Sequence, residues 1–255
     1  MSKIIFDEFG HGPAVVFLHG FCERKEIWRS FVKNMIPDFR IITIDLPAFA
    51  SSDKNNPHFT IDDVADAVAG CLIENNVTNA LIVGHSLGGY VTLSILERHP
   101  QIVKGFCLFH STAFADGMEK KQNRNKSVEF LRKNETKIYI DSFIPNLFFD
   151  PSHPSLKQVL SLAYGISVET LIGYMQAMRD RPDRGHLLKS QCPKLIIAGL
   201  HDPFVSIEDS RKMEKMAINS TYLELEKAAH IGFLENELEC RQSIVAFANR
   251  IFKNE

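Results

Sequence analysis

The chain has 255 residues, of which 24% are charged and 45% are hydrophobic, and its formal net charge is −2. These values are typical of a folded globular protein, and the length suits one large α/β domain. The near-neutral charge, with neither a basic stripe nor an acidic tail, argues against a nucleic acid or an anionic membrane surface as a partner.

The N-terminal residues and the cysteines indicate where the protein works. The segment 1–7 carries one cation followed at once by an acid, which does not fit a signal peptide, and no apolar stretch approaches the ~20 residues that cross a bilayer. The five cysteines form no CxxC pair, and their odd number leaves at least one unpaired. We therefore expect reduced thiols, a cytoplasmic location and no membrane association.

Apolar runs alternate with segments of helical periodicity, the pattern of a parallel sheet covered by helices on both faces. Buried strands are predicted at residues 14–18, 40–44, 80–83, 105–109 and 194–198, and an alternating edge strand at 221–225.

Helix start and stop signals lie between these strands. Thr60 and Asp63 form a potential capping box, and the pair Ser206 and Asp209 predicts another helix start. A helix from Leu87 should end before Pro100 because proline cannot continue it. The last helix should run from about residue 236 to the C-terminus.

The segment 113–188 contains no convincing buried strand. It consists of short amphipathic pieces interrupted by prolines, and it is rich in phenylalanine, tyrosine and methionine. Either it is a helical layer packed on the core, or it is a lid whose inner surface lines a binding site. Because the strand pattern resumes at Lys194, we favour a helical cap over 113–188, inserted into a core domain made of 1–112 and 189–255.

The motif Gly84-His85-Ser86-Leu87-Gly88 follows one predicted strand and opens the next helix. A serine on such a turn is held in a strained conformation with its hydroxyl exposed, and its neighbours two positions away must be small for the turn to close. Gly-x-Ser-x-Gly alone is a weak signal, but between a buried strand and a helix it predicts a nucleophile at Ser86. A phosphate loop fits less well, since no Gly-Lys-Ser/Thr follows.

The backbone near Ser86 should stabilise a developing oxyanion. His19-Gly20-Phe21 directly follows the strand at 14–18, so the N–H of Phe21 can turn toward the serine. The N–H of Leu87, at the start of the helix, is the second donor. Together they predict an oxyanion hole.

A serine nucleophile needs a base, and the base needs an orienting carboxylate. His230 lies in a loop after the last predicted strand, and Asp202 follows the strand at 194–198. Both loops reach the carboxyl edge of the sheet, where Ser86 also lies. We therefore predict His230 as the base and Asp202 as the acid.

Other acids and histidines are alternatives. Asp116 is the rival acid, although we interpret it as a solvent-exposed residue at the start of the lid, and Asp45 comes too early in the chain and should brace the His19 turn. His85 and His201 neighbour predicted site residues and should point elsewhere. His110 and His186 flank the lid, where contact with a substrate is the less favoured reading. No histidine or cysteine spacing suggests a metal site.

These motifs, in this order, resemble the α/β-hydrolase fold superfamily along nearly the whole chain, and the chain is most similar to small capped carboxylesterases and enol-lactone hydrolases. The resemblance implies an eight-stranded, mostly parallel sheet flanked by helices, a helical cap inserted after strand six, and no cofactor. In most relatives, glycines occupy the positions of Ala48 and Ala50 in the loop after Asp45. We expect negative φ at both alanines.

The predicted activity is hydrolysis of small, mostly apolar carboxylic esters or lactones through an acyl-enzyme on Ser86. Apolar walls with few polar groups are expected around the substrate. A thioesterase, a carbon–carbon bond hydrolase or a cofactor-free perhydrolase would use the same three residues. A non-catalytic small-molecule receptor is the alternative from another class. The sequence leaves the natural substrate and the oligomeric state open.

Overall fold

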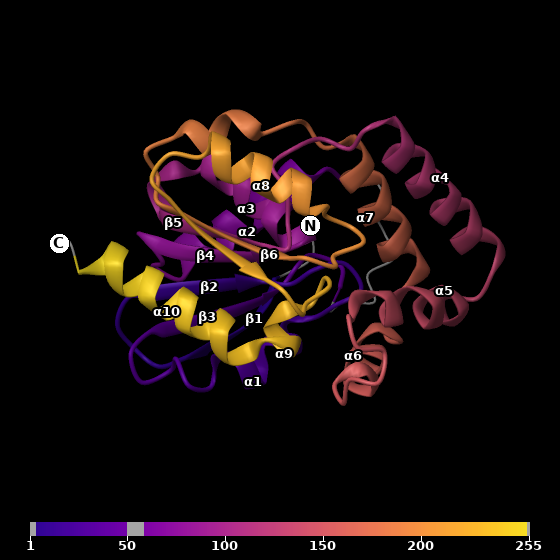
Figure 1. Ribbon diagram of the computed structural model, residues 1–255, viewed down its shortest axis with the longest axis horizontal. Coiled ribbons are helices and arrows are strands. Elements are labelled where there is room, and N and C mark those ends of the chain that lie inside the picture. Colours follow the sequence, from indigo (N-terminus) through magenta and orange to yellow (C-terminus); the bar gives the residue numbers. More distant parts are fainter. Residues whose placement is uncertain (1–3, 50–58, 254–255) are drawn as a thin grey trace.

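A computed structural model of the protein describes residues 4–49 and 59–253. In these ranges the chain forms one seven-stranded sheet flanked by helices (Figure 1). The strands are β1 (Ile5–Phe9), β2 (Ala14–Leu18), β3 (Arg40–Asp45), β4 (Ala80–His85), β5 (Val103–Phe109), β6 (Lys194–Gly199) and β7 (Ser220–Leu225). All six strands predicted from the sequence are present, whereas β1 was not predicted.

The sheet order is β1-β3-β2-β4-β5-β6-β7, and every neighbouring pair is parallel except β1 with β3. The central strands β2, β4 and β6 are buried along their whole length because helices cover both faces. Strand β7 lies at one edge and is half-exposed, as its alternating pattern predicts. Within the described ranges the sheet has seven strands rather than the expected eight, because no strand precedes the edge strand β1 there.

Helices pack on both faces of the sheet, with α2, α3 and α8 on one face and α1 and α10 on the other (Figure 1). Their bounds are α1 (Arg29–Val32), α2 (Ile61–Glu74), α3 (Leu87–Arg98), α8 (Ile207–Met216), α9 (Gly232–Glu235) and α10 (Glu237–Phe252). Thr60 and Asp63 form the predicted capping box on α2, and Ser206 caps α8. None of the helices in the described ranges is long and apolar enough to span a bilayer.

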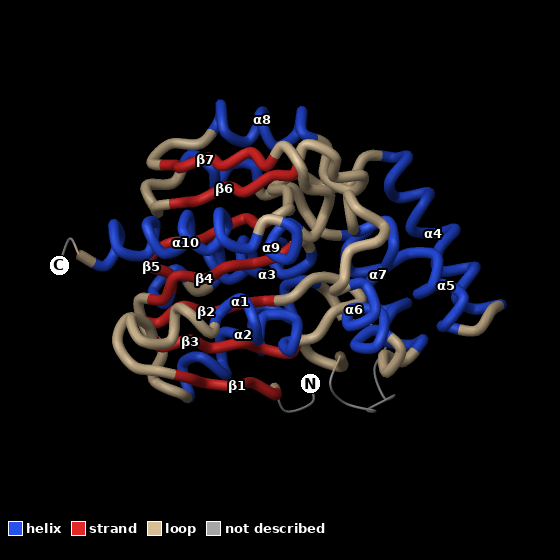
Figure 2. The backbone as a smooth tube through the Cα atoms, turned by 60° about the horizontal axis from the view of Figure 1, so that its bottom comes forward, coloured by secondary structure: helices blue, strands red, loops and turns tan. Residues whose placement is uncertain are grey.

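Four helices follow β5 and precede β6, so the insertion comes after the fifth of the seven described strands. They are α4 (Met118–Lys133), α5 (Thr136–Phe143), α6 (Leu156–Ala163) and α7 (Val168–Asp180). Figure 2 shows them beyond the carboxyl ends of the parallel strands rather than against a face of the sheet. Residues from the loops after β2, β4, β6 and β7 and from these helices therefore line a common cavity.

An aromatic cluster supports the loops at this edge of the sheet. Trp28 packs on Phe233 with ring centroids 4.4 Å apart and on Phe17 at 5.1 Å, and all three side chains are buried. The ring of His85, at the end of β4, lies 5.0 Å from Phe233. This apolar packing fixes the end of β4 and the turn that follows it.

Candidate active site

Ser86 occupies the sharp turn between β4 and α3, with φ 48° and ψ −111°. A non-glycine residue in this region is strained, and the surrounding hydrogen bonds hold it there. The Ser86 N–H donates to the Phe109 carbonyl at 2.9 Å, and the Ser86 carbonyl accepts from the Ser111 hydroxyl at 2.7 Å.

The glycines on either side of Ser86 are required by space. A Cβ on Gly88 would lie 2.4 Å from the Leu18 carbonyl oxygen, and one on Gly84 would lie 2.4 Å from the Gly88 carbonyl oxygen. Both distances are far shorter than any van der Waals contact, and both involve backbone that cannot move aside. The motif is therefore read correctly as a turn that only small residues can close.

His230 and Asp202 lie together, as the sequence predicts. His230 Nδ1 is 2.7 Å from Asp202 Oδ2, and both side chains are almost completely buried. The other carboxylate oxygen accepts from the N–H groups of Phe204 and Val205 at 2.8 and 3.0 Å. Burial alone would raise the pKa of Asp202, but its interactions with His230 and His110 outweigh burial and hold the pKa below its ordinary value.

His110, which we had placed at the edge of the lid, is buried behind Asp202. Its Nε2 accepts from the Gly232 N–H at 3.1 Å, so the proton sits on Nδ1, which faces Asp202 Oδ2 at 3.4 Å. Burial lowers the pKa of His110 to about 4, despite the neighbouring carboxylate. A neutral second histidine therefore supports the ionised Asp202, and the sequence offered no signal for it.

His85 points away from the cavity, as expected, but it connects two parts of the site. Its Nε2 donates to the His230 carbonyl at 2.7 Å, and its Nδ1 is 3.0 Å from the Glu23 carboxylate. The same Glu23 oxygen accepts from the Gly20 N–H at 2.6 Å. Burial lowers the pKa of His85, but the Glu23 charge and hydrogen bond prevail and raise it. A buried ion pair thus links the Gly20-Phe21 turn to the His230 loop.

The turn after β2 is further fixed by His19. Its Nε2 accepts from the Leu46 N–H at 3.0 Å, and its ring lies 4.8 Å from that of Phe49. Asp45 lies 3.8 Å from His19 Nε2 and accepts from the Lys25 N–H at 2.8 Å. Asp45 therefore braces the segment that follows His19, mainly through the backbone of Lys25.

Two expectations about neighbouring residues are wrong. Ala48 has a positive φ of 69°, where negative φ was expected. The turn keeps a conformation that glycine adopts easily because tertiary contacts hold it: the Ala48 carbonyl accepts from the Thr170 hydroxyl at 3.2 Å, and Phe49 is buried against Tyr174. Ala50 lies outside the described residues.

Asp116 is the second correction, because it is buried rather than solvent-exposed. Its side chain is 1% exposed, and its two oxygens bind Arg124 and Arg181. These ion pairs draw it inward from the start of the insertion. The Asp116 oxygens bind arginines, whereas His230 Nδ1 lies against Asp202, so the structure pairs the predicted base with Asp202 and not with this rival acid. His186 pairs with Glu97 on the surface, and His201 stacks on Phe149.

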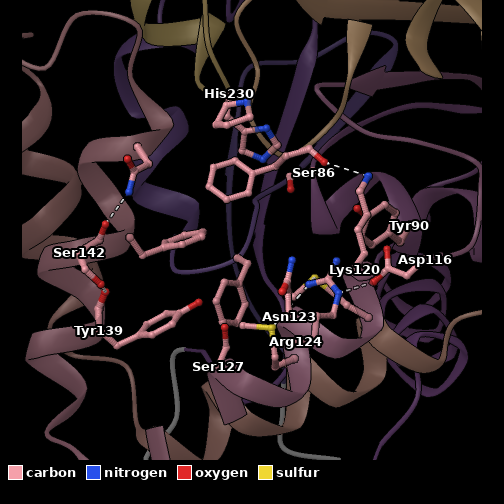
Figure 3. Close-up of a pocket in the computed structure, with 17 residues that line it drawn as sticks. Ser86, Tyr90, Asp116, Lys120, Asn123, Arg124, Ser127, Tyr139, Ser142 and His230 are labelled. Carbon is pink, nitrogen blue, oxygen red and sulfur yellow. Dashed lines mark hydrogen bonds and ion pairs between the residues drawn. The ribbon is translucent and has the colours of Figure 1, made fainter. Parts of the chain in front are cut away.

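A cavity of about 500 Å³ lies between the strand ends and the inserted helices. Ser86 and His230 lie at one end of it (Figure 3). Phe21, Phe143, Phe204, Met175 and Met178 give it apolar walls. The expectation of few polar groups is wrong, however, because the insertion also contributes Asp116, Lys120, Asn123, Arg124, Ser127, Ser142 and Asn146.

The comparisons with known proteins agree with this geometry. Residues 13–134 match the family model described as the alpha/beta hydrolase fold. The chain is 25% identical to the AB hydrolase superfamily protein YisY of Bacillus subtilis, over 96% of this chain and 95% of that protein. It is 26% identical to the pimeloyl-[acyl-carrier protein] methyl ester esterase of Pectobacterium carotovorum, over 97% and 99% of the two chains.

Among solved structures, a thermophilic esterase from Thermogutta terrifontis superposes with a TM-score of 0.90 at 24% identity. The alignment covers 97% of this chain and 93% of the esterase. The strand order, the strained serine turn and these similarities converge: the chain has the α/β-hydrolase fold.

Proposed function

We propose that the protein is a carboxylic ester hydrolase that cleaves small esters or lactones, with Ser86 as nucleophile, His230 as base and Asp202 as the orienting acid. The observation that carries this proposal is the 2.7 Å contact between His230 Nδ1 and Asp202, in the cavity that Ser86 also lines. The similarity to an esterase that acts on a methyl ester supports the choice of bond.

The protonation state of His230 follows from its partner. An ionised carboxylate only accepts hydrogen bonds, so the Nδ1 atom facing Asp202 carries the proton. Nε2 then holds the lone pair that a general base requires. The bond from His85 to the His230 carbonyl, and the bond from the His230 N–H to the Leu147 carbonyl at 2.9 Å, fix the backbone that carries this ring.

We assign the proposed oxyanion hole to two backbone N–H groups. Leu87 is the first residue of α3, so its N–H has no acceptor within the helix and lies at the positive end of the helix dipole. Phe21 follows Gly20, whose position the Glu23 carboxylate fixes. Each such donor stabilises an oxyanion-like transition state by about 3 kcal/mol.

The proposed reaction is acyl transfer in two halves. His230 takes the Ser86 proton as the serine oxygen attacks the ester carbonyl, and the oxyanion binds the N–H groups of Phe21 and Leu87. His230 then gives the proton to the leaving alcohol, and the acyl-enzyme forms. Water, activated by the same histidine, attacks the acyl-enzyme and releases the acid, which restores Ser86.

We further propose that residues 113–188 act as the cap of this site. The insertion lies over the carboxyl edge of the sheet (Figure 2), and its contacts with the core are specific. Tyr174 of α7 donates to the Pro47 carbonyl at 2.8 Å, and Leu147 holds the His230 backbone. A cavity of about 500 Å³ beneath this cap suits a ligand of small to medium size.

Hydrolysis of p-nitrophenyl acetate by the purified chain tests the proposal, together with labelling by a fluorophosphonate probe. Ser86→Ala should abolish both turnover and labelling, because Ser86 is the one serine with a positive φ among residues 4–49 and 59–253. Ser30→Ala, an exposed serine on α1, is the matched control and should leave both unchanged. A Ser86→Ala protein that still labels and still hydrolyses the ester would refute the assignment, and binding without turnover would favour a receptor.

A further inference from the structure

One wall of the cavity is polar and comes mainly from α4. Lys120, Asn123, Arg124 and Ser127 line the cavity and follow the three- and four-residue spacing that places side chains on one face of a helix. Figure 3 shows Asn123, Arg124 and Ser127 across the cavity from Ser86 and His230. The apolar rings near Ser86 and this polar wall therefore line different parts of one cavity.

Arg124 has hydrogen-bonding capacity that the protein does not use. Its Nε is bonded to Asp116, but Nη1 meets only the sulfur atoms of Met175 and Met178, at 3.6 and 3.5 Å. Thioether sulfur is a weak acceptor. Within the ranges that the structure describes, Nη2 has no acceptor among the hydrogen bonds of Arg124. The guanidinium side chain is only 19% exposed, so bulk water does not fully replace the missing acceptors.

The charges around Arg124 leave an excess of positive charge. Asp116 is shared between Arg124 and Arg181, so one carboxylate faces two guanidinium groups. Arg181 also donates to the carbonyls of Met178 and Phe114 and stacks on the Tyr90 ring. Lys120 adds a second cation to the lining; its Nζ donates to the Phe204 carbonyl at 3.2 Å, and its nearest acid is Asp209 at 4.0 Å.

From this arrangement we infer that the natural substrate is an ester or lactone that also carries a carboxylate, which binds Arg124 across the cavity from Ser86, with Lys120 as a second cation in the same lining. The inference rests on the proposed function, which it narrows to a class of substrate. A guanidinium with free Nη donors offers the charge-assisted hydrogen bonds that a carboxylate accepts. Asp116 occupies the Nε group of Arg124 and leaves the Nη groups for this ligand.

The position of Arg124 differs from that of the charged residues of α4 that only face solvent. The face of α4 that carries Lys126, Glu129 and Arg132 is exposed, as charged residues on a cap helix normally are. Arg124 instead turns inward and is held by a carboxylate that is itself 1% exposed. Burying an ion pair of this kind costs desolvation free energy. The Nη groups of Arg124 face the cavity without a strong acceptor, so part of this desolvation cost stays uncompensated until an anion binds.

The test compares charged and neutral esters of matched length. The carboxylate sits in the acyl part in one pair, monomethyl glutarate against methyl pentanoate, and in the alcohol part in the other, 4-acetoxybutyrate against butyl acetate. In at least one pair we expect kcat/KM to be about 10–100-fold higher for the anionic ester, the range that a charge-assisted hydrogen bond supplies. Equal values for both members of both pairs would overturn the inference and leave the proposed function intact.

Two variants connect this preference to the residues named. In Arg124→Met the ratio of anionic to neutral kcat/KM should collapse toward one, whereas the matched control Arg132→Met, an exposed arginine on the same helix, should keep the wild-type ratio. Lys120→Met alters an exposed residue and leaves the Asp116 ion pairs intact, so it tests the same idea even if Arg124→Met fails to fold. It should lower the ratio of anionic to neutral kcat/KM in part. An unchanged ratio in both variants would overturn the assignment of the carboxylate to these cations.

Binding separates the inference from the chemistry. Isothermal titration of monomethyl glutarate and of 4-acetoxybutyrate into the Ser86→Ala protein measures affinity without turnover. We expect at least one of them to bind, and the added Arg124→Met change to weaken that binding by about 10-fold or more. If no ester is hydrolysed by the wild type but this binding is seen, the proposed function fails and the carboxylate site stands. Absence of binding by either ligand would remove the site.

Discussion

Replacing Asp202 with asparagine tests most directly the proposed role of Asp202 as the acid that orients His230. The side chain keeps its shape, and its amide oxygen can still accept from the N–H groups of Phe204 and Val205. The amide nitrogen then takes the place of Oδ2, where His230 Nδ1 lies at 2.7 Å and His110 Nδ1 at 3.4 Å. Because an amide nitrogen only donates, it faces donors on both sides.

His230 can relieve this conflict only by moving its proton to Nε2, the nitrogen that should accept from Ser86. The base then has no lone pair in the right place, and the negative charge that stabilises a histidinium is also lost. In comparable triads this change lowers kcat by about 10⁴-fold, or about 5 kcal/mol of transition-state stabilisation. We expect a loss of that size from Asp202→Asn, with labelling of Ser86 slowed as well.

The assay is kcat for p-nitrophenyl acetate, with circular dichroism to confirm that the variant is folded. Asp116→Asn is the informative comparison, because Asp116 is the other acid that the chain order allows. Its loss should weaken the hold on Arg124 without altering the His230 tautomer, so kcat should fall by less than about 10-fold. If Asp116→Asn causes the large loss and Asp202→Asn the small one, the assignment of the acid is refuted.

Two further predictions concern the scaffold of the site. Gly88→Ala should lower the free energy of unfolding in urea by about 1–3 kcal/mol, because the added Cβ would overlap the Leu18 carbonyl. Gly70→Ala in α2 is the control: its Cβ would meet nothing within 4 Å, so it should raise the free energy of unfolding by about 0.5–1 kcal/mol. Equal effects of the two variants would contradict the steric argument. His110 has a pKa of about 4 in the folded protein and an ordinary pKa near 6.5 in the unfolded chain. Between these two pH values the unfolded chain binds more protons than the folded protein, so the folded protein loses stability as the pH falls from about 6.5 to about 4. His110→Asn should therefore remove about 2 kcal/mol of the stability difference between about pH 7 and pH 5, and an unchanged pH dependence would refute the burial of a neutral histidine.

The elements that define the sheet were predictable from the sequence because they depend on local patterns. A strand buried on both faces, such as β6, is a continuous apolar run, and a half-exposed edge strand, such as β7, alternates. The serine turn was predictable for a similar reason, since small residues two positions from Ser86 report a backbone constraint directly. Strand β1 gave no such signal, because its residues are exposed or half-exposed and include two acids.

The features that could not be predicted depend on contacts between residues that are distant in the sequence and on the side-chain directions that these contacts set. His85 and Glu23 are 62 residues apart, and only the packing of β2 against β4 brings them to 3.0 Å. His110 was expected to flank the lid because it directly follows β5, but it has a positive φ of 46° and its side chain lies beneath Asp202 instead. Ala48 shows the same limit for the backbone: its φ is set by contacts with α7, more than a hundred residues away.

The polarity of the cavity was hidden for a related reason, which bears on the choice of substrate. Helix α4 buries only Val128 and Leu131, so its first half reads in sequence as a solvated helix. Polar contacts rather than apolar burial hold that half over the cavity: Arg124 pairs with Asp116, Asn125 accepts from Arg179, and Lys120 donates to the Phe204 carbonyl. A helix placed by charge rather than by apolar packing presents charge to the space beneath it. The charged and polar residues that make the first half of α4 resemble an ordinary surface helix in the sequence are therefore the ones that we propose bind the substrate carboxylate.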